Sequence, residues 1–364
     1  MRSRPASRPL VLFLLVGWLG ACAEAHGRAA AAADGGAVAD AAASSDARSA
    51  PVEPCSEGRS ESTIAAPAAR RAGYHVLLQR PRVAASAERI AALALVVSDT
   101  RGGMGVSDLV TFGHDGSETR AFFTSDVPYV IGTEPGLEEY VGGGGFSGDR
   151  VYAEIRRFDV TRFDVARSED MPDAPAEPRL SATLDPSDTA PPHFEMANDG
   201  ARAILVTERG GLVVYDTTRG SLEVVDRAHE SDRLQTWLPS PRLSPRGSRV
   251  AFARSGAPTT LTVRELETRD ERSHALPPGV VSIAFLGEDH VLLLSRSGDG
   301  TLGVLDLRDG SSRSLALGLP LAGDRFTESL DVSADGRTLV VTEEQGARLR
   351  VVRCEPSLVA IAGG

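Results

Sequence analysis

Tight glycine turns recur at near-equal spacing in the C-terminal half of this chain. Each turn follows an apolar stretch and leads into a new β-prone run, and the turn glycines are Gly200, Gly247, Gly287 and Gly336. Successive glycines are 47, 40 and 49 residues apart, and a four-stranded propeller blade takes about 40–50 residues. The repeat predicts an all-β fold, a β-propeller of four-stranded antiparallel blades.

The same spacing gives an expected number of blades. Fainter copies of the turn lie at 146–149 and near 86–88. Dividing the folded region, roughly residues 70–361, by the period favours six blades. Seven blades remain an alternative if residues 56–80 supply another one. The last unit is expected to end in an outer strand over 358–361, since this run is apolar and follows a turn.

The N-terminus has the pattern of an export signal. Arg2, Arg4 and Arg8 precede an apolar run over 10–18 that is too short for a comfortable transmembrane helix. The run ends in Leu-Gly-Ala-Cys at 19–22, which resembles the bacterial lipobox. This resemblance implies that residues 1–21 are a lipoprotein signal peptide and that Cys22 is diacylated. The alternative is an ordinary secretory signal cleaved near Ala23.

The segment 22–54 is expected to be a flexible tether to the propeller domain at 55–364. It is rich in Ala, Gly, Ser and Asp and lacks the large apolar side chains of a core. Acyl chains on Cys22 would anchor the protein without spanning the bilayer. Ala23, and not Asp, follows Cys22. By resemblance to the sorting rule of enteric bacteria, this predicts the outer membrane, with the periplasmic or the surface-exposed side left open.

The other two cysteines are expected to form a disulfide. With Cys22 acylated, Cys55 precedes the propeller and Cys354 falls in its last blade. Two thiols in an oxidising compartment favour pairing, and the two ends of a closed ring lie near each other. The alternative is a pair of unrelated cysteines.

Composition limits the classes of partner and chemistry. The formal net charge is −11, so the chain lacks the basic footprint of a nucleic-acid-binding protein. All 39 basic residues are arginine, which excludes a lysine nucleophile. No metal-ligand spacing, calcium loop or nucleophile motif is found, so we expect no catalytic residues, no cofactor and no metal site.

Three weaker features have a structural and a functional interpretation. The histidines are expected to face solvent in loops, with a ligand role as the alternative; they are His193, His229, His274 and His290. The four glycines at 142–145 are expected in an innermost strand where blades crowd the axis, and a ligand-contacting surface is the alternative. The acidic, Pro-rich insert at 168–178 is expected to be a mobile loop, with cation binding as the alternative.

The turn motif resembles a known family. Ser-Pro-Arg-Gly-Ser-Arg-Val-Ala-Phe at 244–252 is similar to the Ser-Pro-Asp-Gly motif of TolB-like and WD-like propeller repeats, and residues 333–339 match it with Ala for Pro. The resemblance implies the architecture and leaves activity open. The first functional hypothesis is a monomeric, membrane-anchored propeller that binds an envelope protein or peptide without catalysis. The alternative is a secreted hydrolase or lactonase-like enzyme with acidic and His residues at the central channel.

Overall fold

The computed structural model describes most of the chain beyond residue 54. All described residues fall in one compact unit that spans Ser49–Gly364. The described positions are 55, 57–69, 72–98, 104–123, 139–157, 162–167, 178–183, 193–206, 211–227, 239–253, 260–295, 301–316 and 329–362.

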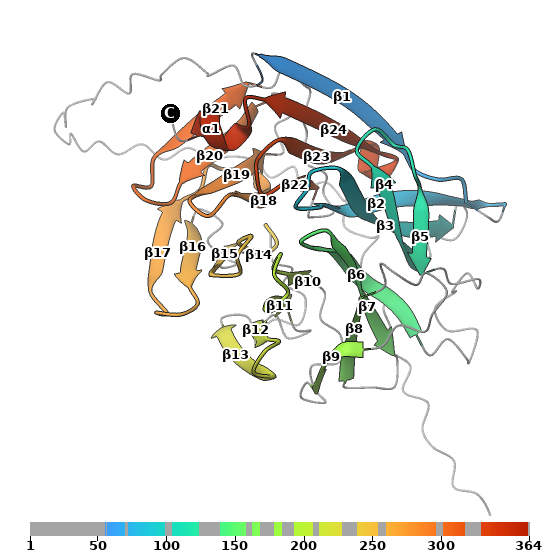
Figure 1. Cartoon of the computed structure of the whole chain (residues 1–364), viewed down its shortest axis with the longest axis horizontal. Coiled ribbons are helices and arrows are strands. Elements are labelled where there is room, and N and C mark those ends of the chain that lie inside the picture. The colour runs from blue at the N-terminus through green and yellow to red at the C-terminus, as the bar shows by residue number, and fades with distance from the viewer. Residues whose placement is uncertain are drawn as a thin grey trace, which may run out of the picture. The chain divides into compact units, whose positions relative to one another are not determined.

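The described strands form six four-stranded antiparallel sheets (Figure 1). We number these sheets along the chain as blades 1 to 6, and we give the strands of each blade from the innermost to the outermost. Blade 1 contains β2 (Tyr74–Val83), β3 (Arg89–Ser98), β4 (Met104–Gly113) and β5 (Arg120–Phe123). Blade 2 contains β6 (Glu139–Ser147), β7 (Arg150–Arg157), β8 (Arg162–Arg167) and β9 (Pro178–Thr183). Blade 3 contains β10 (His193–Met196), β11 (Arg202–Val206), β12 (Leu212–Asp216) and β13 (Ser221–Asp226).

The second half of the ring repeats this order. Blade 4 contains β14 (Arg242–Leu243), β15 (Arg249–Ala253), β16 (Thr260–Glu265) and β17 (Glu271–Ala275). Blade 5 contains β18 (Val280–Leu286), β19 (His290–Ser295), β20 (Thr301–Asp306) and β21 (Ser312–Ala316). Blade 6 contains β22 (Leu330–Val332), β23 (Thr338–Glu343), β24 (Arg348–Glu355) and β1 (Gly58–Ala65). The 3₁₀ turn η1 (Glu344–Gly346) joins β23 to β24, and α1 (Leu358–Ala362) follows β24.

The six blades close into a ring. The innermost strands contact one another in the order β2, β6, β10, β14, β18 and β22, and β22 returns to β2. Apolar clusters fill the spaces between neighbouring blades, for example between blades 4 and 5 and between blades 5 and 6. Every residue of β18 is buried, as expected of a strand covered on both faces. The predicted fold class, an all-β propeller, is confirmed.

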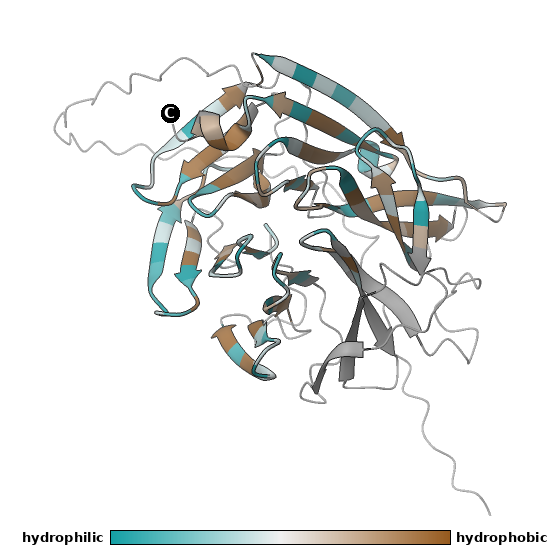
Figure 2. Cartoon of the chain, viewed as in Figure 1, coloured by the Kyte–Doolittle hydropathy of each residue, from teal (hydrophilic) through white to brown (hydrophobic). Residues whose placement is uncertain are grey.

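The chain closes the ring with its own N-terminal strand. β1 pairs antiparallel with β24, from Gly58 opposite Glu355 to Ala65 opposite Arg348 (Figure 1). Residues 56–80 therefore supply the outer strand of blade 6 and the start of blade 1, and no further blade. Hydrophilic residues dominate β1, whereas the neighbouring strands β24 and β23 of blade 6 are mostly hydrophobic (Figure 2).

The prediction of an outer strand over 358–361 is wrong. This segment forms the short helix α1, because β1 already occupies the free edge of β24 and leaves no strand for it to pair with. Leu358 and Ala362 are buried in the apolar cluster of blades 5 and 6, and the backbone N–H of Leu358 donates to the carbonyl oxygen of Gly336 at 2.9 Å. Within the described residues, no helix has the length and apolarity needed to cross a bilayer.

The repeated motif builds the turn between the first two strands of a blade. In blade 4, Gly247 has φ +66° and its N–H donates to the Ser244 carbonyl at 2.8 Å. The Ser244 hydroxyl accepts from the N–H of Arg249 at 3.1 Å. The turns also form hydrogen bonds between neighbouring blades. The N–H of Asn198 in blade 3 donates to the carbonyl oxygen of Pro245 in blade 4 at 3.0 Å. The motif therefore has a structural role that extends from one blade to the next.

Candidate functional site

A buried arginine lies where the innermost strands meet. Arg242 opens β14 and is 3% exposed. Its Nε donates to the two carboxylate oxygens of Glu195 on β10, at 3.2 and 3.0 Å. Its Nη2 pairs with the carboxylate of Asp331 on β22. Its Nη1 donates to the carbonyl oxygens of Ile283 and Leu330, both at 3.0 Å.

Both carboxylates are also held by backbone amides. Glu195 accepts from the N–H of Leu243 at 3.3 Å, and Asp331 accepts from the N–H of Val83 on β2 at 2.7 Å. The network therefore reaches β2, β10, β14, β18 and β22. Buried charges are tolerated where each one is paired and its remaining donors and acceptors are satisfied. Arginine suits this place because its planar fork can meet several acceptors at once.

The sixth inner strand, β6, is the glycine run. A Cβ on Gly144 would lie 2.7 Å from Leu109 Cδ1 and 2.8 Å from the carbonyl oxygen of Tyr152, and one on Gly145 would lie 2.7 Å from Arg82 Cγ. Side chains of blade 1 therefore occupy the space that larger residues would need. The expectation of a crowded innermost strand is confirmed at Gly144 and Gly145 of the four glycines.

A small cavity borders the network. It has a volume of ≈50 Å³, and its walls include Arg82, Glu195, Arg242, Asp331, Phe146 and Tyr152. One water needs about 10–15 Å³ of such space, so the cavity can hold a few waters. Small-molecule sites measure about 300–1,000 Å³. The space beside the two carboxylates is therefore much too small for an organic substrate.

The charged residues of the axis share one position in the repeat. Each stands five residues before the turn residue of its blade, which is Gly200, Gly247 or Gly336 in blades 3, 4 and 6 and Ala87, with φ +66°, in blade 1. The residues at this position are Arg82, Gly143, Glu195, Arg242, Ser282 and Asp331 in blades 1 to 6. Alignment of the copies on the turn would have found this layer, whereas a search for local motifs missed it.

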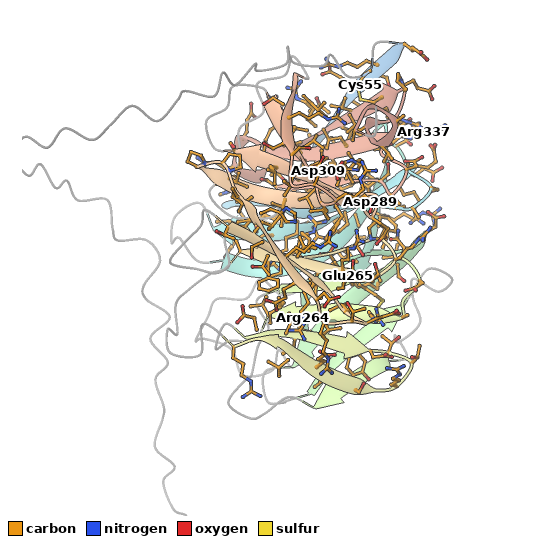
Figure 3. The ribbon with its side chains drawn as sticks, turned by 90° about the vertical axis from the view of Figure 1, so that its left-hand side faces the viewer. Cys55, Arg264, Glu265, Asp289, Asp309 and Arg337 are labelled. Carbon is orange, nitrogen blue, oxygen red and sulfur yellow. A yellow bond between two sulfur atoms is a disulfide. The ribbon has the colours of Figure 1, made fainter. Side chains whose placement is uncertain are left out.

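A larger groove lies between blade 3 and the turn that joins β16 to β17 in blade 4. Its volume is ≈350 Å³, and three arginines and three carboxylates line it: Arg202, Arg219, Arg269, Asp216, Glu223 and Glu267. Arg264, labelled in Figure 3, donates to Glu223 at 2.9 Å across the two blades. Near the groove, Leu222 and Val224 on β13 are 40% and 41% exposed. Among the described residues, these two are the large hydrophobic side chains that are exposed to solvent.

The predicted disulfide is confirmed. Cys55 and Cys354 are bonded, with their Cα atoms 4.5 Å apart, and both side chains are buried. Figure 3 places Cys55 beside β1. The signal peptide at 1–21, the lipidation site Cys22 and the tether to residue 54 lie outside the described residues. Within the described chain, no group of three or more His, Cys, Asp or Glu residues is placed to hold a metal.

Two of the four histidines contradict their expected place in solvent-facing loops. His274 on β17 and His290 on β19 are 8% and 5% exposed. Burial, with Arg272 as a lesser cause, lowers the pKa of His274. His290 Nε2 lies 3.4 Å from Asp306 Oδ2. Both histidines therefore belong to strands and not to loops. His193 begins β10, while His229 and residues 168–177 lie outside the described chain.

Comparison with known proteins adds no family. No model of a known protein family and no curated protein matches this chain. The resemblance to TolB-like and WD-like repeats therefore depends on the turn motif alone.

Proposed function

We propose that this chain is a lipid-anchored propeller of the bacterial cell envelope that binds a protein or peptide partner and does not transform a substrate. The observation that carries the proposal is the Arg242 network. An enzyme at the central channel needs carboxylates that are free to meet a substrate. Here Glu195 and Asp331 converge at the axis, but both are bonded to Arg242 and to backbone amides. The axis therefore suits a structural role.

Anchorage follows from the N-terminal sequence. Acylation of Cys22 would hold the protein on the membrane, and Ala23 at the next position favours the outer membrane. The tether that ends at residue 54 would give the propeller some freedom to reach a partner.

The outer strand of blade 3 is the surface that suits a partner best. Edge strands of soluble proteins usually carry charged or polar residues, yet β13 exposes Leu222 and Val224. The charge-rich groove beside them supplies polar contacts. A protein or peptide can use an apolar patch rimmed by charged groups.

The test is crosslinking in intact envelopes followed by affinity purification of the protein. We expect one or a few envelope proteins to be enriched with the native chain and lost with Leu222→Ser/Val224→Ser. The matched control is Glu267→Gln, which changes the groove without changing the apolar pair. Enrichment that is the same with all three proteins would contradict the proposed surface. Recovery of no partner, together with ester or lactone hydrolysis by the purified protein, would favour the enzyme.

Anchorage has a separate test. Membrane fractionation should move Cys22→Ala from the membrane to the soluble fraction. A Cys22→Ala protein that stays with membranes would contradict acylation.

A further inference from the structure

The disulfide lies at the point where the N-terminal segment enters the propeller. Cys55 stands three residues before Gly58, the first residue of β1. The partner cysteine lies on the neighbouring strand, β24. Any tension along the N-terminal segment therefore reaches Cys55 before it reaches β1.

β1 alone is poorly suited to withstand such tension. It is the outermost strand of blade 6, so its backbone pairs on one side only. Seven of its eight residues are exposed or half-buried, and Ile64 is the one buried residue of the strand. The pair nearest the N-terminal segment is Gly58 with Glu355. A pull on the preceding residues would load this pair first and then each following pair in turn, so the strand would peel from its end.

β24 is held much more firmly. It pairs with β1 on one side and β23 on the other. Leu349, Val351 and Val352 are each at most 1% exposed. The N–H of Cys354 donates to the carbonyl oxygen of Arg337 at 2.9 Å. A force delivered at Cys354 therefore acts on a strand that is bonded on both edges and buried in two apolar clusters.

We propose that the Cys55–Cys354 disulfide is a mechanical clamp, which passes tension from the membrane tether to β24 and spares the closing strand β1. This role rests on the proposed anchorage through Cys22. The disulfide would then do more than stabilise the folded state. Without it, the ring would open from β1 if the protein were pulled between its membrane anchor and a bound partner.

The test is single-molecule force spectroscopy on the purified, full-length mature protein carrying Cys22→Ala. One handle is attached at the N-terminus and the other at a tag inserted in the exposed turn at Asp309 and Gly310. With the disulfide intact, we expect no extension step before global unfolding. In Cys55→Ala/Cys354→Ala, we expect an early low-force step as β1 and its connection to β2 are released. Counted from Cys55 to Gly73, the released segment has 19 residues, and at ~3.4 Å each they limit that step to roughly 65 Å.

Two further measurements keep the outcome clear. If the double variant does not fold, the native protein is held at moderate force and a phosphine reductant is added, which should produce the same step. Ile64→Ala with the disulfide intact weakens β1 and should still show no early step. An early step in the oxidised native protein, or its absence after reduction, would overturn the clamp. Neither result depends on acylation, which the Cys22→Ala fractionation tests separately.

Discussion

At the scale of single residues, the axis of the propeller is lined by two buried arginines and two buried carboxylates, whose formal charges sum to zero. Arg82 and Arg242 lie around one small cavity with Glu195 and Asp331, and all four are buried. Such a layer specifies how blades meet, because Arg242 bonds to residues of blades 3, 5 and 6 at once. An apolar axis would place fewer geometric demands on the ring.

Arg242→Met tests this role. The substitution removes the guanidinium that pairs with the buried carboxylates of Glu195 and Asp331, so we expect a loss of about 3–5 kcal/mol in the free energy of unfolding. Denaturant titration measures the loss. Arg337→Gln is the matched control, since its side chain is 57% exposed and 3.7 Å from Asp335, and exposed pairs contribute about 0–1 kcal/mol. Equal losses in the two variants would show that burial of the network is unimportant.

The combined variant Glu195→Gln/Arg242→Met/Asp331→Asn separates two contributions to the free energy of unfolding, that of the charges in the network and that of the packing of its side chains. Removal of all three charges together should cost less than Arg242→Met alone, because no buried carboxylate then loses the Arg242 guanidinium. A triple variant less stable than the single one would mean that hydrogen bonds to the backbone dominate.

At the scale of elements, the innermost strand β6 depends on its lack of side chains. Gly144→Ala would place a Cβ within 2.8 Å of a backbone oxygen and two methyl groups, and backbone cannot move aside cheaply. We expect a loss of about 1–3 kcal/mol, measured by thermal unfolding. The control is Gly58→Ala on β1, where the new Cβ would meet Glu355 Cβ at an ordinary 3.6 Å. A Gly144→Ala protein as stable as this control would contradict the crowding.

The turns between outer strands carry the clearest acid dependence. The guanidinium of Arg308 donates to the Asp306 carboxylate at 3.0 and 2.6 Å. It holds the pKa of that carboxyl well below its usual value. Burial opposes this shift in pKa, whereas the backbone N–H of Arg308 and the nearby His290 lower the pKa further. A depressed pKa stabilises the folded state above about pH 4, and this contribution is lost as the pH falls further.

The corresponding prediction compares native protein with Asp306→Asn. Urea midpoints between about pH 5 and pH 3 should fall less in the variant, because it has no carboxylate to protonate at this turn. Parallel falls in the two proteins would contradict it.

These elements also show what sequence can and cannot predict. The turn copies were recognisable because a positive φ at Gly247 or Gly336 is a local requirement. β1 was missed because its partner, β24, lies almost at the other end of the chain. The axial network was missed for a similar reason: Glu195, Arg242 and Asp331 come from three different blades. Local patterns predicted the modules, and only the ring determined which residues meet.

At the scale of the whole molecule, stability depends on how the ring is closed. The disulfide joins residues 299 positions apart, and the loss of chain entropy for so long a loop can contribute up to about 5 kcal/mol. β1 contributes through eight residue pairs with β24, and backbone hydrogen bonds are each worth about 0.5–1.5 kcal/mol net. The two terms can be separated if the strand is removed from a protein that already lacks the disulfide.

A chain that starts at Pro67 and carries Cys354→Ala isolates the strand. Against full-length Cys55→Ala/Cys354→Ala, we expect it to lose about 2–5 kcal/mol of unfolding free energy and to self-associate, because β24 then has an open edge beside Leu349 and Val351. Sedimentation and denaturant titration measure both effects. A peptide of residues 56–69 should restore the midpoint and the monomer, whereas the same peptide with Ile64→Ala should restore less, since Ile64 is the buried residue of β1. If the truncated chain matches the full-length one without any peptide, the last blade is complete with three strands and β1 does not close the ring.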